Sequence, residues 1–204
     1  RGFVTLSFNQ IALAKRRVVY DNRNQHSEDL SLFGPSRNEG QGATGVADVD
    51  RAYDYAGDTY DFFSSSFGRD SIDGNGMTIV QTVRYCSTNP LADCPYENAF
   101  WDGAQMVYGD GFTSADDVVA HELSHGVTQY ESNLFYYMQS GSINEALSDI
   151  FGEFVDLTNG KGTDTPAVRW KMGEDITGGA LRDMMNPGLF GGPDSMTSSD
   201  YDCG

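Results

Sequence analysis

The sequence predicts an α+β fold in which a β-rich N-terminal lobe with one long helix is followed by two consecutive helices. Two observations carry this prediction: β-branched, partly alternating segments are confined to the first half of the chain, and apolar residues recur at helical spacing in three places. We divide the chain into a β-rich lobe, a pair of helices and a C-terminal part. These three parts comprise residues 1–112, 113–157 and 158–204.

Short strands separated by turn-rich loops are expected in the N-terminal half. The best strand candidate is Met77 to Tyr85, which is β-branched and follows a turn cluster. The weaker candidates are Val4–Phe8, Arg17–Tyr20, Asn98–Trp101 and Gln105–Tyr108. Residues 22–45 are rich in Asn, Gly and Pro, so we expect a loop there.

Three helices are expected from apolar spacing. Between Ala47 and Phe67 the apolar positions recur at intervals of three and four, as one buried helix face requires. Ser114, with Asp117 three residues later, resembles a capping box and predicts a second helix that runs through Tyr130. The third helix is expected from about Ser142 to Leu157.

The charge of the chain excludes two classes of partner. Thirty acidic residues against 13 Lys and Arg in 204 residues give a net charge of −17, which is the wrong sign for nucleic acid or an anionic membrane surface. No stretch approaches the roughly 18 to 20 apolar residues of a membrane span. The first residues lack the layout of a signal peptide, so the chain is either cytosolic or already processed.

Three cysteines are present, which is an odd number. Cys86 and Cys94 lie eight residues apart and predict a disulfide that closes a short loop between two extended segments, as in exported proteins. Cys203 is then left over, and we expect it to pair with a cysteine outside this chain.

The second predicted helix carries His121-Glu122-Leu123-Ser124-His125. Positions i and i+4 lie on one helix face about 6 Å apart, so both imidazoles can bind one tetrahedral cation. Glu122 lies about 100° round the helix, from where it can reach a water on that cation. The alternative is a chance match on a surface helix, but two of the three histidines fall in this motif, among apolar neighbours.

A catalytic zinc site needs a third protein ligand and an open position. Glu145 lies twenty residues after His125, far enough for the chain to turn and return as a facing helix. Asp149 lies one turn further on, where it can accept the spare ring N–H of a ligating histidine. The alternative for both acids is a solvated helix face, but the rest of this helix is apolar.

From Val46 to Asp194 the sequence resembles the thermolysin-like metallopeptidases, which are gluzincins. The motifs that carry the resemblance are Asn98–Trp101, Met106–Gly111, Asp117–Tyr130 and Ser140–Gly152. The resemblance implies zinc binding by His121, His125 and Glu145, with Glu122 as general base. It also implies that Tyr136 donates to the oxyanion and that Asp149 orients a zinc ligand.

Substrate residues are implied by the same resemblance. Asn98 and Ala99 match the edge strand that binds an extended peptide, and Arg182 matches an arginine that binds a substrate carbonyl. Val118 and Leu181, with Phe112, match an apolar pocket, which implies cleavage before a bulky apolar residue. The expected partner is therefore a peptide or protein substrate.

A calcium site is also implied by the resemblance. Calcium ligands of the family are matched by Asp117, Asp156 and Glu174. The first two residues precede the loop that opens residues 158–204, and Glu174 lies in it. Arg169 and Lys171 stand where a two-calcium site has acids. We therefore expect one calcium ion rather than two.

The resemblance further implies a mainly helical C-terminal domain that carries a second proton donor, a histidine. The sequence stops before such a residue, and His26 lies in a polar N-terminal loop where we expect a surface role. We therefore expect a truncated form of a longer secreted enzyme, with its own missing C-terminal segment or propeptide as a further partner. The alternative is a catalytically incompetent metal-binding fragment or a peptide-binding pseudo-enzyme.

Overall fold

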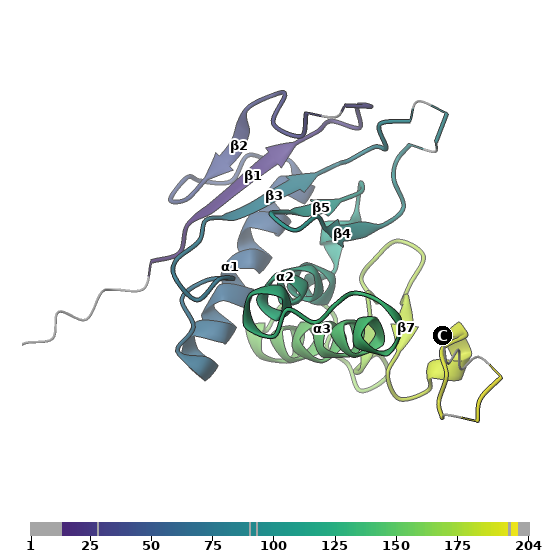
Figure 1. Ribbon diagram of the computed structural model, residues 1–204. Helices are drawn as coiled ribbons and strands as arrows, with labels where there is room; N and C mark the ends of the chain where they lie inside the picture. Colours follow the sequence, from purple (N-terminus) through teal and green to yellow (C-terminus); the bar gives the residue numbers. More distant parts are fainter. Residues whose placement is uncertain (1–13, 28, 90, 93, 196, 200–204) are drawn as a thin grey trace, which may run out of the picture.

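A five-stranded mixed sheet forms the upper part of the molecule (Figure 1). The computed structural model describes residues 14–27, 29–89, 91–92, 94–195 and 197–199. In spatial order the strands are β2 (Pro35–Asn38), β1 (Arg17–Asp21), β3 (Ile79–Val83), β5 (Met106–Tyr108) and β4 (Ala99–Trp101). The two central pairings are parallel, and both edge strands run antiparallel to their neighbours. Strand β4 is therefore an edge with one side unpaired within the sheet.

Helix α1 (Ala47–Phe67) packs beneath this sheet, as its apolar spacing predicts (Figure 1). Its buried side chains meet the inner face of the strands in one core. The core members include Val19, Val49, Ala52, Ala56, Tyr60, Ile79 and Met106. The helix ends at Gly68, which adopts a left-handed conformation with φ of 68° that a glycine accommodates without strain. The predicted bounds of this helix are confirmed.

Helices α2 (Asp116–Glu131) and α3 (Met138–Asn159) lie side by side below the sheet (Figure 1). A short 3-10 helix, η1 (Phe112–Ser114), leads into α2. After α3 the chain forms a two-stranded sheet of β6 (Lys171–Met172) and β7 (Arg182–Asp183), then the 3-10 helix η2 (Pro187–Phe190). The order of a β-rich half followed by two helices is the predicted α+β arrangement.

Three local predictions differ from the structure. Helix α2 begins after Ala115, and the Ser114 hydroxyl donates to the carbonyls of Gly111 at 2.7 Å and Asp175 at 2.9 Å, so the predicted capping box is wrong. Helix α3 begins at Met138, four residues before the predicted start. Strand β2 lies inside the segment predicted as a loop, because its register is set by pairing with β1. The predicted strand at residues 4–8 falls outside the described residues.

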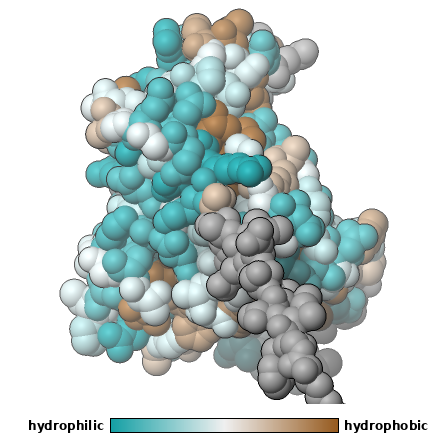
Figure 2. Space-filling view, turned by 90° about the vertical axis from the view of Figure 1, so that its left-hand side faces the viewer, coloured by the Kyte–Doolittle hydropathy of each residue, from teal (hydrophilic) through white to brown (hydrophobic). Residues whose placement is uncertain are grey.

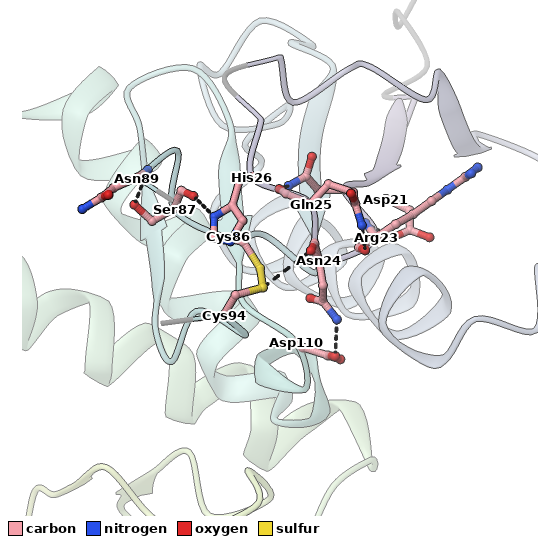
Figure 3. The surroundings of a disulfide bond; sticks show 11 residues. Asp21, Arg23, Asn24, Gln25, His26, Cys86, Ser87, Asn89, Cys94 and Asp110 are labelled. Atoms are coloured by element: carbon pink, nitrogen blue, oxygen red, sulfur yellow. Dashed lines mark hydrogen bonds between the residues drawn. A yellow bond between two sulfur atoms is a disulfide. The ribbon is translucent and has the colours of Figure 1, made fainter. Parts of the chain in front are cut away.

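The predicted disulfide between Cys86 and Cys94 is confirmed (Figure 3). It joins the segment after β3 to the segment before β4, with 5.3 Å between the two Cα atoms. The Sγ atom of Cys94 lies 3.5 Å from the carbonyl oxygen of Asn24, whose side-chain amide donates to Asp110 at 2.7 Å. His26 is exposed, and its Nδ1 lies 2.6 Å from the Ser87 carbonyl oxygen. Cys203 lies outside the described residues.

One face of the molecule is dominated by polar side chains (Figure 2). Figure 2 shows a face covered largely by hydrophilic residues with small apolar areas, in keeping with the net charge of −17. Among the described residues, none of the helices combines the length and apolar character that crossing a membrane requires.

Close packing of α3 on α2 depends on Gly152, and we expect Gly152→Ala to destabilise the fold by about 1–3 kcal/mol. A Cβ atom there would lie 2.7 Å from the carbonyl oxygen of Asp117 and 3.0 Å from the Cε of Met172. This clash outweighs the helix propensity that alanine gains, which is about 1 kcal/mol. Urea denaturation measures the effect. The control is Gly42→Ala, where a Cβ would meet nothing within 4 Å; equal stability of both variants would contradict the prediction.

Candidate active site

Helix α2 presents the two motif histidines on one face, pointing toward α3. The Nε2 atoms of His121 and His125 are 2.9 Å apart, and both side chains are buried. They lie one helical turn apart, so the backbone alone brings the two rings together. Neighbouring apolar residues of the same helix, among them Val119 and Leu123, anchor it in the core below the sheet.

Helix α3 brings Glu145 to the same point. Its Oε2 atom lies 3.4 Å from Nε2 of His121, and its Oε1 atom lies 3.4 Å from Nε2 of His125. Within the part of the chain that the structure describes, these residues are the one set of His, Cys, Asp or Glu with three ligand atoms within 4.8 Å of one another. The predicted convergence of Glu145 with the two histidines is confirmed.

Side chains of α3 also hold the outer nitrogen of each imidazole. Asp149 Oδ1 lies 2.8 Å from Nδ1 of His121. Asn144 Oδ1 lies 2.8 Å and Ser148 Oγ 3.1 Å from Nδ1 of His125. The sequence analysis assigned Asp149 a place beside a histidine but missed Asn144 and Ser148. Their signal was a polar pair four residues apart, directly before Glu145 and Asp149.

This arrangement fits a zinc ion. Carboxylate and amide oxygens only accept hydrogen bonds, so each Nδ1 of His121 and His125 carries a proton, and the neutral form of each ring presents the lone pair of Nε2. These two lone pairs and the Glu145 carboxylate converge on one point, as the ligands of a metal ion do. Tetrahedral ligands at about 2.0–2.1 Å from zinc are about 3.4 Å apart, and the observed separations are 2.9, 3.4 and 3.4 Å.

Glu122 lies beside these ligands without joining them. Its side chain is buried, and the nearby backbone of Trp101 lowers its pKa. Burial raises the pKa of Glu122 to about 7, with His121 lowering it and Glu145 raising it. Its carboxylate lines the same cavity as the three ligands, so it can act on a molecule that reaches them.

A cavity of about 780 Å³ opens between β4 and the two helices. The residues predicted to bind substrate all line it, together with the zinc ligands. They are Asn98, Ala99, Phe112, Val118, Leu181 and Arg182. Strand β4 runs along one wall, and its edge away from β5 is the unpaired edge of the sheet. Val118 is 4% exposed and Leu181 40% exposed, so of these two apolar residues it is Leu181 that can be replaced without disturbing the core.

Tyr136 and Arg182 lie on opposite sides of the ligand set. The Tyr136 hydroxyl donates to Glu145, and its ring centroid is 5.8 Å from that of His125. Arg182 forms a bidentate pair with Asp149, through Nε at 2.9 Å and Nη2 at 2.6 Å. Since the same Asp149 carboxylate also faces His121, one carboxylate orients both a zinc ligand and the arginine.

The three acids predicted to bind calcium gather behind the zinc site. Asp117 and Asp156 are almost fully buried, and Asp156 Oδ1 and Glu174 Oε2 have no hydrogen-bond partner. Burial, reinforced by neighbouring carboxylates, raises the pKa of Asp156 to about 9 and of Glu174 to about 8. The sequence analysis missed Glu153, which is 1% exposed with Oε2 unpartnered. Among the described residues these acidic oxygens do not form a set of three within 4.8 Å.

Two family models match successive parts of the chain. The thermolysin metallopeptidase catalytic domain matches residues 7–129, and the thermolysin metallopeptidase alpha-helical domain matches residues 132–203. The boundary between them falls at the C-terminal end of α2. The two histidines therefore come from the first domain and Glu145 from the second.

Curated relatives and a solved structure agree with this match. A zinc metalloproteinase of Renibacterium salmoninarum is 44% identical over 78% of this chain and 31% of the relative. An extracellular metalloprotease of Pectobacterium carotovorum is 45% identical over 84% of this chain and 50% of the relative. The precursor of protealysin, a metalloproteinase from Serratia proteamaculans, superposes with a TM-score of 0.71 at 40% identity, covering 89% of this chain and 56% of that one. The chain thus spans about half or less of these two curated relatives, and it belongs to the thermolysin family of metallopeptidases.

Proposed function

We propose that the protein containing this chain is a zinc-dependent endopeptidase. One observation carries the proposal: His121, His125 and Glu145 converge at the base of an open cavity, while the buried Glu122 carboxylate stands beside them without ligating. A purely structural metal site is closed by four protein ligands and has no need of such a carboxylate. Hydrolysis by a metal-activated water requires three protein ligands, an open path to the metal and an adjacent base.

The residues of the chain divide the work of hydrolysis between them. A zinc ion held by the three ligands would supply Lewis acidity that polarises the scissile carbonyl. Glu122 accepts the proton of the attacking water and delivers it to the leaving amine. Tyr136 donates a hydrogen bond to the oxygen on which charge develops, and Arg182 adds positive charge from the opposite side of the ligand set. Asp149 keeps Arg182 and His121 in place.

Substrate binding along β4 is supported by its free edge. An extended peptide that adds to an exposed strand gains main-chain hydrogen bonds with little demand on sequence. Asn98 and Ala99 lie at the start of this edge, on the wall of the cavity. Specificity would come from the apolar side chains of Val118, Leu181 and Phe112. We propose that they receive a bulky apolar residue on the amine side of the cleaved bond.

Removing zinc tests the proposed function. The zinc-loaded full-length protein should hydrolyse an unstructured protein such as casein, lose this activity when a chelator removes zinc, and regain it when zinc is returned. Mass spectrometry of the native protein measures the zinc content in each state. A protein that holds one zinc and binds peptides without cleaving them would instead be a peptide-binding pseudo-enzyme. Activity that survives complete removal of zinc would refute the proposal.

The apolar pocket predicts the effect of Leu181→Ala. Loss of the side chain removes contact area for a bulky apolar residue, so kcat/KM for a substrate with leucine after the cleaved bond should fall about tenfold. The same substrate with alanine there should change less than threefold, since a small side chain does not reach Leu181. Cleavage of the two peptides is followed by chromatography. Equal losses for both peptides would show that Leu181 does not contribute to this specificity.

We also propose that one calcium ion binds the acidic cluster. Support comes from buried carboxylate oxygens without partners on α3 and after β6. Among the described residues, no ion pair joins these acids to a Lys, Arg or His side chain. Oxygen ligands of this kind suit calcium. Glu153 adds a fourth carboxylate to the predicted Asp117, Asp156 and Glu174. Bound calcium would tie α2 and α3 to the loop that follows them.

Secretion is the remaining proposal. The Pectobacterium relative is named an extracellular metalloprotease, and the Cys86–Cys94 disulfide is of the kind that persists outside the cytosol. Immunodetection in the culture medium of the producing organism, with a cytosolic protein as control, tests this. Retention of the protein inside intact cells would refute it.

A further inference from the structure

We propose that Gln129 is a positioning residue that fixes the position of the edge strand β4 relative to the zinc-binding helix α2. The inference rests on the proposed peptidase function, since it concerns how an extended peptide would be received. Gln129 lies one turn after His125 and two turns after Glu122 on α2. Its side chain reaches out of the helix to the end of β4 and lines the same cavity.

The amide of Gln129 makes two different hydrogen bonds. Its Oε1 atom accepts from the indole Nε1 of Trp101 at 2.8 Å, and its Nε2 atom donates to the carbonyl oxygen of Gly103 at 3.3 Å. An indole N–H can only donate and a carbonyl can only accept. To bond to both groups, a side chain must offer one acceptor and one donor. A carboxylate has no donor and an ammonium group has no acceptor.

Trp101 touches the same face of α2 at two further points. Its backbone lies close enough to the Glu122 carboxylate to lower the pKa of that group. Its ring lies against Gly126, where an added Cβ would come within 3.4 Å of the ring carbons Cη2 and Cζ2. The contacts at Glu122, Gly126 and Gln129 are spaced by four and three residues, so they run along one side of the helix. The end of β4 is therefore fixed to the helix that carries the zinc ligands.

This attachment matters because β4 is held by a partner strand on one side only. Its residues pair with β5, and its other edge is free toward the cavity. Asn98 and Ala99 lie three and two residues before Trp101, and each strand residue spans about 3.3 Å. A shift at Trp101 therefore moves the groups that would bind a peptide relative to His121. The affinity of a ligand that binds only at the metal should not change with this shift, whereas the affinity of a ligand that pairs with the strand should fall.

The test compares two ligands on the zinc-loaded full-length protein. The long probe is a peptide phosphonamidate with three residues that can pair with β4, and the short probe is the phosphonamidate of leucine amide alone. In Gln129→Leu the long probe should bind about tenfold more weakly by calorimetry, because two hydrogen bonds are lost, and the short probe should bind within twofold of wild type. NMR of the same protein should show a shift of the Trp101 indole N–H signal, which is assigned by its loss in Trp101→Phe.

Tyr130→Phe is the matched control, one position further along the same helix and 46% exposed; it should leave both affinities and the Trp101 indole signal unchanged. Equal weakening of the two probes in Gln129→Leu would overturn the inference, because it would indicate damage to the zinc site itself. So would a shifted indole signal with unchanged affinity for the long probe. A wild-type protein that holds zinc and binds neither probe would overturn the proposed function instead, and this inference with it.

Discussion

Replacing Glu122 by glutamine should lower kcat by about 10³-fold and leave one zinc ion bound. Glutamine has the size of glutamate but cannot take up the proton of the attacking water. The three zinc ligands and their partners Asp149 and Asn144 do not include Glu122, so metal affinity should be unaffected. Turnover of a quenched-fluorescence peptide and zinc content by mass spectrometry are measured on the same sample.

Glu131→Gln is the matched control for this experiment. It changes a glutamate on the same helix, but one whose side chain is 63% exposed and pairs with Arg69. Glu131 does not line the cavity that holds the zinc ligands, so activity should remain within twofold of wild type. Unchanged turnover in Glu122→Gln with zinc still bound would sink the assignment of Glu122 as general base.

The effect of Asp156→Asn on stability should change sign with calcium. Without calcium, burial among other acids disfavours the charged form of Asp156 and raises its pKa, and asparagine avoids this cost of burying a carboxyl group, so the variant should melt above wild type. At a calcium concentration of about 100 Kd the wild type gains about 2.7 kcal/mol from binding, which is roughly 5–10 °C in a domain of this size. The variant loses an anionic ligand and should gain little. Thermal unfolding in zinc-saturated buffer, with and without calcium, measures both quantities.

Asp61→Asn serves as the control for this crossover, since Asp61 is an exposed acid on α1 that pairs with Lys15. Its melting temperature should rise with calcium by the same amount as that of wild type. The calcium proposal fails if calcium leaves the melting temperature of wild type unchanged, or if Asp156→Asn retains the full increase.

The zinc ligands were predictable because helix periodicity alone brings positions 121 and 125 together. Glu145 required one further assumption, that the chain returns as a facing helix, and the packing of α3 on α2 meets it. The partners of His125 were not predictable in the same way. Amide and hydroxyl side chains such as Asn144 and Ser148 are common on helices, and their contact with a ring depends on how two helices cross, which periodicity does not encode.

Strand β2 shows what local sequence cannot supply. Pro-Ser-Arg-Asn has no β-branched residue, so its strand conformation comes from pairing with β1 and from contacts of Arg37. The guanidinium of Arg37 lies 3.8 Å from the ring centroid of Tyr53 and forms an ion pair with Asp50, both on α1. These are tertiary interactions that override a weak propensity. Ser114 failed as a cap for a related reason, since the Asp175 carbonyl, distant in sequence, competes for its hydroxyl.

Because the metal ligands come from two domains, metal affinity reports how strongly these two domains associate. His121 and His125 belong to the segment that matches the catalytic domain, and Glu145 belongs to the segment that matches the alpha-helical domain. An ion bound by all three ligands therefore links the two domains at their interface. By thermodynamic reciprocity, any change that draws α3 away from α2 lowers zinc affinity by the same factor by which zinc strengthens their association.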